Sequence, residues 1–117
     1  MTRSKPKILI VSRDPALADV RKSVLERAGY PTIPASDFQS VRDACQKFKV
    51  GLVMIGYSVP PAEKRRAWSA AREVCKTPIL ELVRGGKAEI IDSGALFVHQ
   101  SHTPVDFLQA VQSILGK

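Results

Sequence analysis

The sequence has little that would mark a membrane segment, a disulfide scaffold or a metal site. Its longest apolar runs, such as Ile8–Val11 and Leu52–Ile55, fall far short of the roughly 20 residues that a membrane-spanning helix needs. The only two cysteines, Cys45 and Cys75, stand far apart and form no CxxC or Cys/His ligand pattern. We therefore expect buried, reduced thiols, with neither a disulfide framework nor a zinc site.

Acidic residues are also few. The chain has 11 Asp and Glu against 18 Lys and Arg, which gives a net charge of +7 and a pI near 9.8. This balance favours acidic partners or polyanions but identifies none. Residues 1–7 lack an apolar signal segment, so the expected location is the cytoplasm. A length of 117 residues predicts a single domain, 1–117, with a flexible start at 1–6 and a core at 7–115.

Short apolar, β-rich runs alternate with longer segments of helical period along the chain. This alternation is typical of a parallel sheet covered by helices. The predicted strands span 7–12, 32–34, 51–55, 79–83 and 95–99, and the predicted helices span about 14–29, 36–49, 60–75, 88–93 and 103–115. The expected fold class is α/β, with a doubly wound five-stranded parallel sheet in the order 2-1-3-4-5.

The first two predicted helices have identifiable caps and apolar faces. Asp14 is the expected cap of the first helix, and Ser36 with Gln39 is the candidate capping box of the second. The apolar face of the first helix is expected at Leu17, Val20, Val24 and Leu25, and that of the second at Phe38, Val41, Cys45 and Phe48.

In a doubly wound sheet, the functional crevice lies at the carboxyl ends of the strands, near the switch point between the first and third strands. The residues that follow the strands are therefore the candidates for function. They are Ser12, Arg13, Asp14, Gly56, Tyr57, Ser58, Val83, Arg84, Lys87, His99, Gln100 and Ser101.

Two segments carry a resemblance to a known family. Residues 8–15, ILIVSRDP, are similar to the opening of response-regulator receiver domains, in which an apolar strand ends in two adjacent acids followed by an acid and a proline. Residues 52–60, LVMIGYSVP, resemble the segment that carries the phosphoaccepting aspartate. Weaker matches at 77–80, 94–95 and 104–111 extend the resemblance over nearly the whole chain, and it implies the flavodoxin-like (βα)5 receiver fold.

In receivers, two acids hold Mg²⁺, an aspartate accepts the phosphoryl group, and a Thr/Ser and a Lys bind its oxygens. The resemblance places these functions on Ser12 and Arg13, Gly56, Val83 and Gln100, in that order. None of these residues suits its inherited function, because Mg²⁺ prefers anionic oxygens and glycine carries no nucleophile. We expect a pseudo-receiver with no catalytic residue, no enzyme activity, no metal and no cofactor.

Basic residues near the crevice could form an anion site. Arg13, Arg84 and Lys87 could converge there and hold a small anionic ligand. The alternative is that the arginines solvate loop ends or pair with Asp14 and Glu81.

The third predicted helix carries a second basic group. Lys64, Arg65, Arg72 and Lys76 lie near Trp68, and together they could contact a polyanion such as nucleic acid. The alternative is a solvated helix face, with Trp68 packed against the sheet or a neighbouring helix.

In receivers, the face made by the fourth helix, the fifth strand and the last helix commonly pairs or docks partners. The resemblance places Ile90, Phe97 and Phe107 on this face. Core packing of Phe107 and partial burial of Phe97 are the competing interpretation. His99 and His102 have no acidic or cysteine companion at ligand spacing, so we interpret them as ordinary loop histidines.

The function predicted from the sequence is that of a stand-alone signalling module of bacterial two-component systems. It would act independently of phosphorylation, by docking a protein partner or by homodimerisation. The alternative is a sensor of a small anion or of nucleic acid, through the crevice or the basic third helix. No contact with a membrane is expected.

Overall fold

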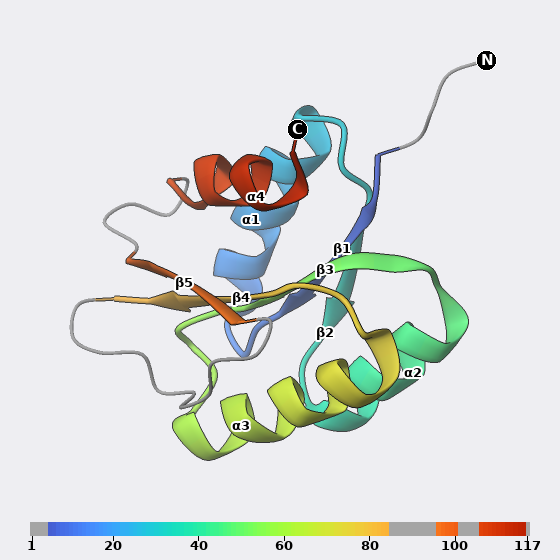
Figure 1. The fold of residues 1–117 in the computed structure, drawn as a ribbon. Helices are drawn as coiled ribbons and strands as arrows, with labels where there is room; N and C mark the ends of the chain where they lie inside the picture. Colours follow the sequence, from blue (N-terminus) through green and yellow to red (C-terminus); the bar gives the residue numbers. More distant parts are fainter. Residues whose placement is uncertain (1–4, 85–95, 101–105, 117) are drawn as a thin grey trace.

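The computed structural model describes residues 5–84, 96–100 and 106–116, and it has the predicted α/β architecture (Figure 1). Five parallel strands form one sheet in the order β2-β1-β3-β4-β5, so the predicted strand order is confirmed. The strands are β1 (Lys7–Val11), β2 (Thr32–Ala35), β3 (Val50–Ile55), β4 (Ile79–Val83) and β5 (Leu96–Gln100). The helices are α1 (Pro15–Arg27), α2 (Phe38–Lys47), α3 (Pro61–Ala70), its π-helical continuation η1 (Ala71–Cys75) and α4 (Phe107–Leu115). The helix expected at 88–93 lies outside the described residues.

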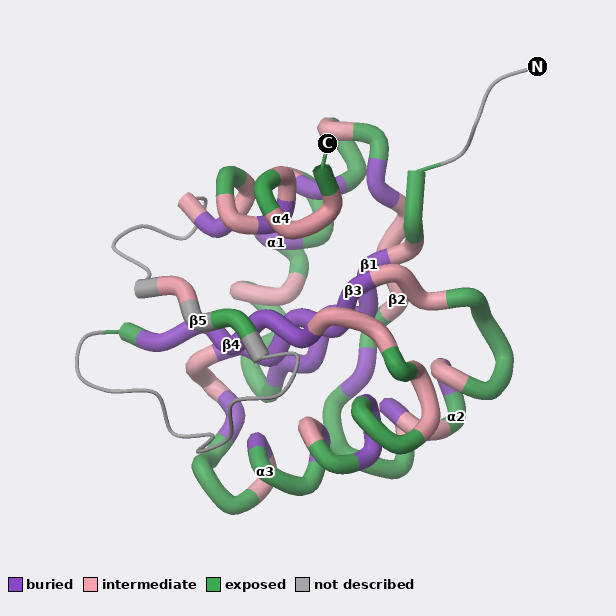
Figure 2. The backbone as a smooth tube through the Cα atoms, viewed as in Figure 1, coloured by how far each residue is buried: buried purple, intermediate pink, exposed green. Residues whose placement is uncertain are grey.

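Helices cover both faces of the sheet. Figure 1 shows α1 and α4 on one face and α2, α3 and η1 on the other. Alternate strand residues pack into the two layers: Leu9 and Val53 on the α2–α3 side, Ile8 and Leu52 on the α1–α4 side. The central strands are buried on both sides, as Figure 2 shows, which explains their nearly continuous apolar sequences. Across the described parts of the chain, every helix is too short or too polar to pass through a membrane.

Helix α1 has the predicted start but not the predicted buried face. The Asp14 side chain accepts a hydrogen bond from the Leu17 N–H at 3.2 Å, which confirms the cap. The buried residues of α1 are Arg21 and Leu25, with 1% and 0% exposure, whereas Val20 is 40% exposed. The prediction was wrong at Val20 because the face of α1 toward the sheet includes a charged residue, which a hydrophobic pattern does not reveal.

The cap of α2 differs from the predicted box of Ser36 and Gln39. Asp37 is the capping residue: its Oδ1 accepts a hydrogen bond from the Ser40 N–H at 2.8 Å, and Ser40 Oγ accepts one from the Asp37 N–H at 3.1 Å. The hydrogen bonds from Ser40 hold the pKa of Asp37 below its usual value. The cap therefore lies one residue later in the chain than expected.

The predicted apolar face of α2 is only partly buried. Val41 is fully buried and Ala44 joins it in the core, whereas Phe38 and Phe48 are each 40% exposed. The inward face is thus narrower than predicted, and two aromatic side chains remain accessible to solvent.

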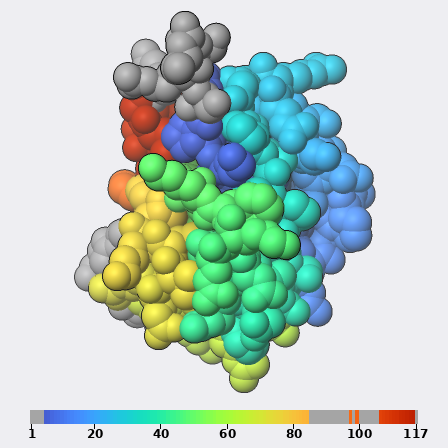
Figure 3. Space-filling view, turned by 90° about the vertical axis from the view of Figure 1, so that its right-hand side faces the viewer, coloured from blue at the N-terminus to red at the C-terminus, as the bar shows by residue number. Residues whose placement is uncertain are grey.

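Cys45 of α2 and Cys75 of η1 form a disulfide bond, with their Cα atoms 5.0 Å apart. The expectation of reduced thiols was therefore wrong. The two cysteines are far apart in the sequence, so their proximity could not be inferred from spacing. In the structure the end of α2 packs beside η1, and Figure 3 shows the two segments as adjoining green and yellow surfaces. The bond joins two of the three elements that cover this face of the sheet.

The disulfide joins residues 30 positions apart, and such a cross-link removes conformational entropy from the unfolded chain. We expect the double substitution Cys45→Ala/Cys75→Ala, or reduction, to lower the free energy of unfolding by about 3 kcal/mol. Urea unfolding followed by circular dichroism, with and without dithiothreitol, measures the difference. The double variant serves as the control, since it should not respond to dithiothreitol. Equal midpoints for the oxidised and reduced wild type would contradict the expectation.

Candidate functional site

The loops after β1 and β3 meet at the carboxyl edge of the sheet. The backbone N–H groups of Ser12 and Gly56 continue the strand ladder by hydrogen bonds of 3.0 and 2.9 Å. Ser58 then links the two loops, because its Oγ lies 3.2 Å from Ser12 Oγ and accepts a hydrogen bond from the Arg13 N–H at 3.0 Å. The structure thus brings together Ser12, Arg13 and Gly56, the positions to which the resemblance assigned metal binding and phosphoryl acceptance.

Arg21 fills the space beside Gly56. Its side chain reaches the crevice from α1 and is only 1% exposed. A Cβ atom added to Gly56 would collide with Arg21 Nη1 and lie 3.3 Å from the Val11 carbonyl oxygen. At the position to which the resemblance assigned phosphoryl acceptance, this chain therefore has a glycine and a buried guanidinium.

The Arg21 guanidinium has few polar contacts. Within the described part of the chain, its buried Nε and Nη1 have no hydrogen-bond partner. Arg21 Cζ lies 4.9 Å from the centroid of the Tyr57 ring, which is a cation–π geometry. Burial lowers the pKa of Arg21, while Tyr57 and the more distant charge of Asp14 act in the opposite direction. The group is a desolvated cation that is only partly compensated.

The hydrophobic pattern of α1 did not reveal Arg21. Two signals were nevertheless present in the sequence. Arg21 lies four residues after Leu17 and four before Leu25, so it shares their helix face. Gly56 also leaves a space after a buried strand, which a long side chain from a neighbouring helix can fill.

Arg13, Arg84 and Lys87 were predicted to converge on the crevice, and the described residues show Arg13 directed to α3 and Arg84 beside Tyr57. Arg13 Nη1 instead pairs with Glu63 Oε1 of α3 at 2.7 Å, and the side chains are 44% and 39% exposed. Arg84 Cζ lies 5.9 Å from the centroid of the Tyr57 ring. Lys87 lies outside the described residues.

Lys64 and Glu81 form a buried ion pair on the α3 side of the sheet. Lys64 Nζ lies 2.9 Å from Glu81 Oε2 and donates a longer hydrogen bond of 3.4 Å to the Leu82 carbonyl. The two side chains are 1% and 0% exposed. The prediction that Lys64 contacts a polyanion is therefore wrong. Lys64 lies on the inner face of α3 with Ala67, and Ala71 at the start of η1 continues this buried face.

The other predicted polyanion contacts are exposed but do not share one surface with Lys64. Arg72 Cζ lies 5.2 Å from the centroid of the Trp68 ring. Trp68 is itself partly buried against the core between the sheet and α3, which confirms the alternative interpretation of this residue. Arg65 is exposed on α3, and Lys76 is exposed at the end of η1, where its φ is 54°.

The residues predicted for a docking face differ in exposure. Phe97 on β5 is 46% exposed, whereas Phe107 on α4 is 1% exposed and packs in the core. The core interpretation of Phe107 is therefore correct, and this residue is not part of an interface.

Val83 is 3% exposed and stands opposite Gln100 in the β4–β5 register. Ile90 lies outside the described residues.

Candidate metal ligands do not cluster in residues 5–84, 96–100 and 106–116: no group of three His, Cys, Asp or Glu side chains is placed to share an ion. His99 Nε2 lies 3.2 Å from Asp106 Oδ1, and both side chains are partly buried. His102 lies outside the described residues. Asp14 is the acidic residue of the segment 12–14 that follows β1, and its carboxylate caps α1.

Substitutions at Arg21 and Gly56 should be energetically coupled. Arg21→Met should leave the free energy of unfolding unchanged or raise it by up to about 2 kcal/mol, because it removes a buried charge with unpaired N–H groups. Gly56→Ala should lower the free energy by about 1–3 kcal/mol, because the added Cβ displaces the guanidinium. Gly56→Ala should be less harmful in the Arg21→Met background, because the flexible methionine side chain can adapt. Urea unfolding of the four proteins completes the double-mutant cycle, and zero coupling would argue against direct contact.

The Lys64–Glu81 pair gives a second test. Lys64→Met should lower the free energy of unfolding by about 3 kcal/mol, because it removes the cation that faces a buried carboxylate. The double substitution Lys64→Met/Glu81→Leu should recover most of this loss. Arg65→Met, on the exposed side of the same helix, is the matched control and should change stability by less than about 0.5 kcal/mol. Thermal unfolding distinguishes these cases, and a double variant no more stable than Lys64→Met would refute the expected compensation.

Comparisons with known proteins identify the fold. No family model and no curated protein sequence matches the chain. A two-component response regulator from Clostridium difficile has a TM-score of 0.80 and 19% identity, covering 97% of this chain and 98% of the other. The receiver domain of a sensor histidine kinase from Pseudomonas aeruginosa PAO1 was solved with magnesium in its active-site cleft. It has a TM-score of 0.76 and 16% identity, and the match covers 97% of this chain and 99% of that domain.

The chemotaxis response regulator CheY4 of Vibrio cholerae gives a TM-score of 0.75 at 20% identity and covers 95% of this chain and 99% of that protein. Identities this low leave the function to be argued from the residues of the site. The chain has the fold of response-regulator receiver domains.

Proposed function

We propose that this protein is a receiver-type signalling module that acts without phosphorylation, by docking a protein partner or a second copy of itself. The observation that carries the proposal is the guanidinium of Arg21 beside Gly56. Gly56 has no nucleophile, and the buried arginine occupies the space that a side chain at this position would need.

The surroundings of this site also disfavour a divalent metal. Ser12 Oγ lies within hydrogen-bond distance of both the backbone of Asp14 and the hydroxyl of Ser58. Arg13 points to Glu63, and Arg21 adds a buried positive charge. Mg²⁺ requires several oxygen ligands, with carboxylates preferred, and a neighbouring cation repels it. The phosphoryl chemistry of a receiver would therefore lack both its acceptor and its metal.

A module without a switchable acceptor would present its docking surface constitutively. Phe97, 46% exposed on β5, supports a contact on the face formed by β5 and α4, because exposed aromatic side chains are frequent at the centres of protein interfaces. The partner would be a kinase, a receiver or an output protein of a bacterial, cytoplasmic two-component pathway, or a second copy of this chain.

A sensor of a small anion is the second candidate, and one observation favours it. The buried Nε and Nη1 of Arg21 have no hydrogen-bond partner in the described structure, and such donors would be satisfied by an anion. The guanidinium of Arg84 lies against the same Tyr57 ring and would add to the attraction.

Treatment with acetyl phosphate and Mg²⁺, followed by intact-mass spectrometry, tests the leading proposal. The wild-type protein should gain no phosphoryl group, because it lacks an acceptor carboxylate at Gly56. An active receiver treated in parallel provides the positive control. A phosphorylated species of the wild type would overturn the proposal.

Thermal unfolding in the presence of inorganic phosphate separates the two candidates. A docking module should respond to phosphate to the same extent in the wild type and in Arg21→Met, since phosphate also stabilises folded proteins without a specific site. A midpoint that rises with phosphate in the wild type but not in Arg21→Met would instead support the anion sensor.

A further inference from the structure

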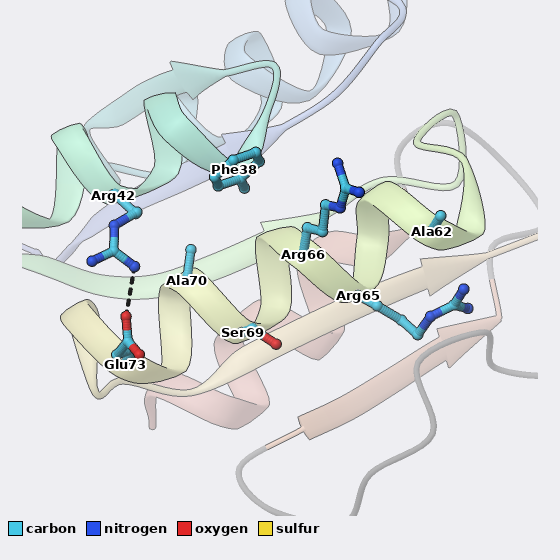
Figure 4. A pocket seen from close by; sticks show the side chains of 8 residues that line it. All are labelled: Phe38, Arg42, Ala62, Arg65, Arg66, Ser69, Ala70 and Glu73. Atoms are coloured by element: carbon cyan, nitrogen blue, oxygen red, sulfur yellow. Dashed lines mark hydrogen bonds and ion pairs between the residues drawn. The ribbon is translucent and has the colours of Figure 1, made fainter.

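A groove lies between α2 and α3 on the face of the domain opposite α1 and α4. Its volume is about 620 Å³, and Figure 4 shows side chains from both helices along it. Residues from α3 and η1 recur at intervals of three and four, so one helix face forms a continuous wall. The lining residues are Phe38, Arg42, Ala62, Arg65, Arg66, Ser69, Ala70 and Glu73.

The groove carries an excess of positive charge. Arg42 Nη1 pairs with Glu73 Oε1 at 2.6 Å and closes one end (Figure 4). Arg65 and Arg66 are exposed, and neither has a carboxylate partner in the described part of the chain. In Figure 4 the Arg66 side chain rises toward α2, whereas Arg65 extends along the other flank of α3. The Arg66 guanidinium is therefore available to carboxylates of a molecule between α2 and α3, and the Arg65 guanidinium to those of a segment that extends across α3.

The groove also has an apolar part. Phe38 is the first residue of α2, directly after the Asp37 cap, and its side chain is 40% exposed. Ala62 and Ala70 contribute only small side chains opposite it. A volume of about 620 Å³ lies in the range of ligand pockets, so it can receive a few side chains of a peptide rather than a folded domain.

The walls of the groove are held in place before any partner binds. The Cys45–Cys75 disulfide joins α2 to η1 beyond the Arg42–Glu73 pair. The Arg13–Glu63 ion pair connects the start of α3 to the loop after β1. Such pre-organisation reduces the conformational entropy that binding must remove.

We propose that this groove binds an acidic peptide segment with an apolar anchor residue, carried by the partner protein; this proposal rests on the docking function proposed above. The anchor lies on Phe38, and acidic side chains pair with Arg65 and Arg66. A nucleic acid fits less well, because Trp68 is packed rather than open for base stacking, and the Glu73 carboxylate lies in the groove.

The experiment uses the oxidised full chain and a fluorescein-labelled peptide of about a dozen residues, in which Leu alternates with pairs of Glu. Fluorescence anisotropy should show binding that Arg66→Glu and Arg65→Glu each weaken by about tenfold, the equivalent of one charge-assisted contact. Lys22 is an exposed residue of α1, on the other side of the sheet from the groove. The control Lys22→Glu changes the net charge by the same amount as Arg66→Glu and should alter peptide affinity less than about twofold. Phe38→Ser should also weaken binding, and amide chemical shifts should map the peptide to α2 and α3.

Several results would overturn the assignment. One is equal binding of a peptide with Gln in place of Glu, and another is equal weakening by Lys22→Glu and Arg66→Glu. Absence of binding, or displacement of the peptide by single-stranded DNA at lower concentration, would also reject it. Phosphorylation of the wild type by acetyl phosphate would instead refute the proposed function while leaving the peptide measurement as it stands, so the two failures are distinguishable.

Discussion

The carboxyl edge of the sheet depends on a steric match between Arg21 and Gly56. The glycine leaves a space after β3, and the guanidinium from α1 fills it. The arrangement is energetically unfavourable in itself, because Nε and Nη1 are buried without hydrogen-bond partners in the described structure. The two apolar layers must therefore offset it. Local features that oppose stability tend to occur at functional sites, and this one lies at the carboxyl edge of a doubly wound sheet.

A second buried cation approaches the same region from the other layer. Lys64 extends from α3 to Glu81 on β4, whereas Arg21 extends from α1 to the end of β3. One cation has a carboxylate partner and the other has the face of Tyr57. Part of the net charge of +7 is thus inside the molecule, so surface charge must be judged residue by residue. Among the exposed arginines, Arg66 remains available in the groove beside α2.

Much of the fold was predictable because its signals are local. Continuous apolar runs marked the central strands, β4 spans the predicted residues, and Asp14 caps α1 as expected. The order of motifs also placed Gly56 at the carboxyl edge of the sheet. The burial of Arg21 and the Cys45–Cys75 bond were not predicted from these patterns, because both depend on which helix faces meet in three dimensions. Patterns of hydrophobicity identify apolar inward faces and overlook a cation that shares such a face.

The disulfide belongs to only one of the two helical layers. It joins α2 to η1, whereas the described contacts of α1 and α4 with the sheet are non-covalent. A layer without a cross-link can separate in a partial opening, while a cross-linked pair of helices tends to open with the whole domain. Amide hydrogens of α1 and α4 would then exchange with solvent before those of α2 and η1. The layer that carries Arg21 would be the one that opens transiently, and the layer that forms the groove would remain closed.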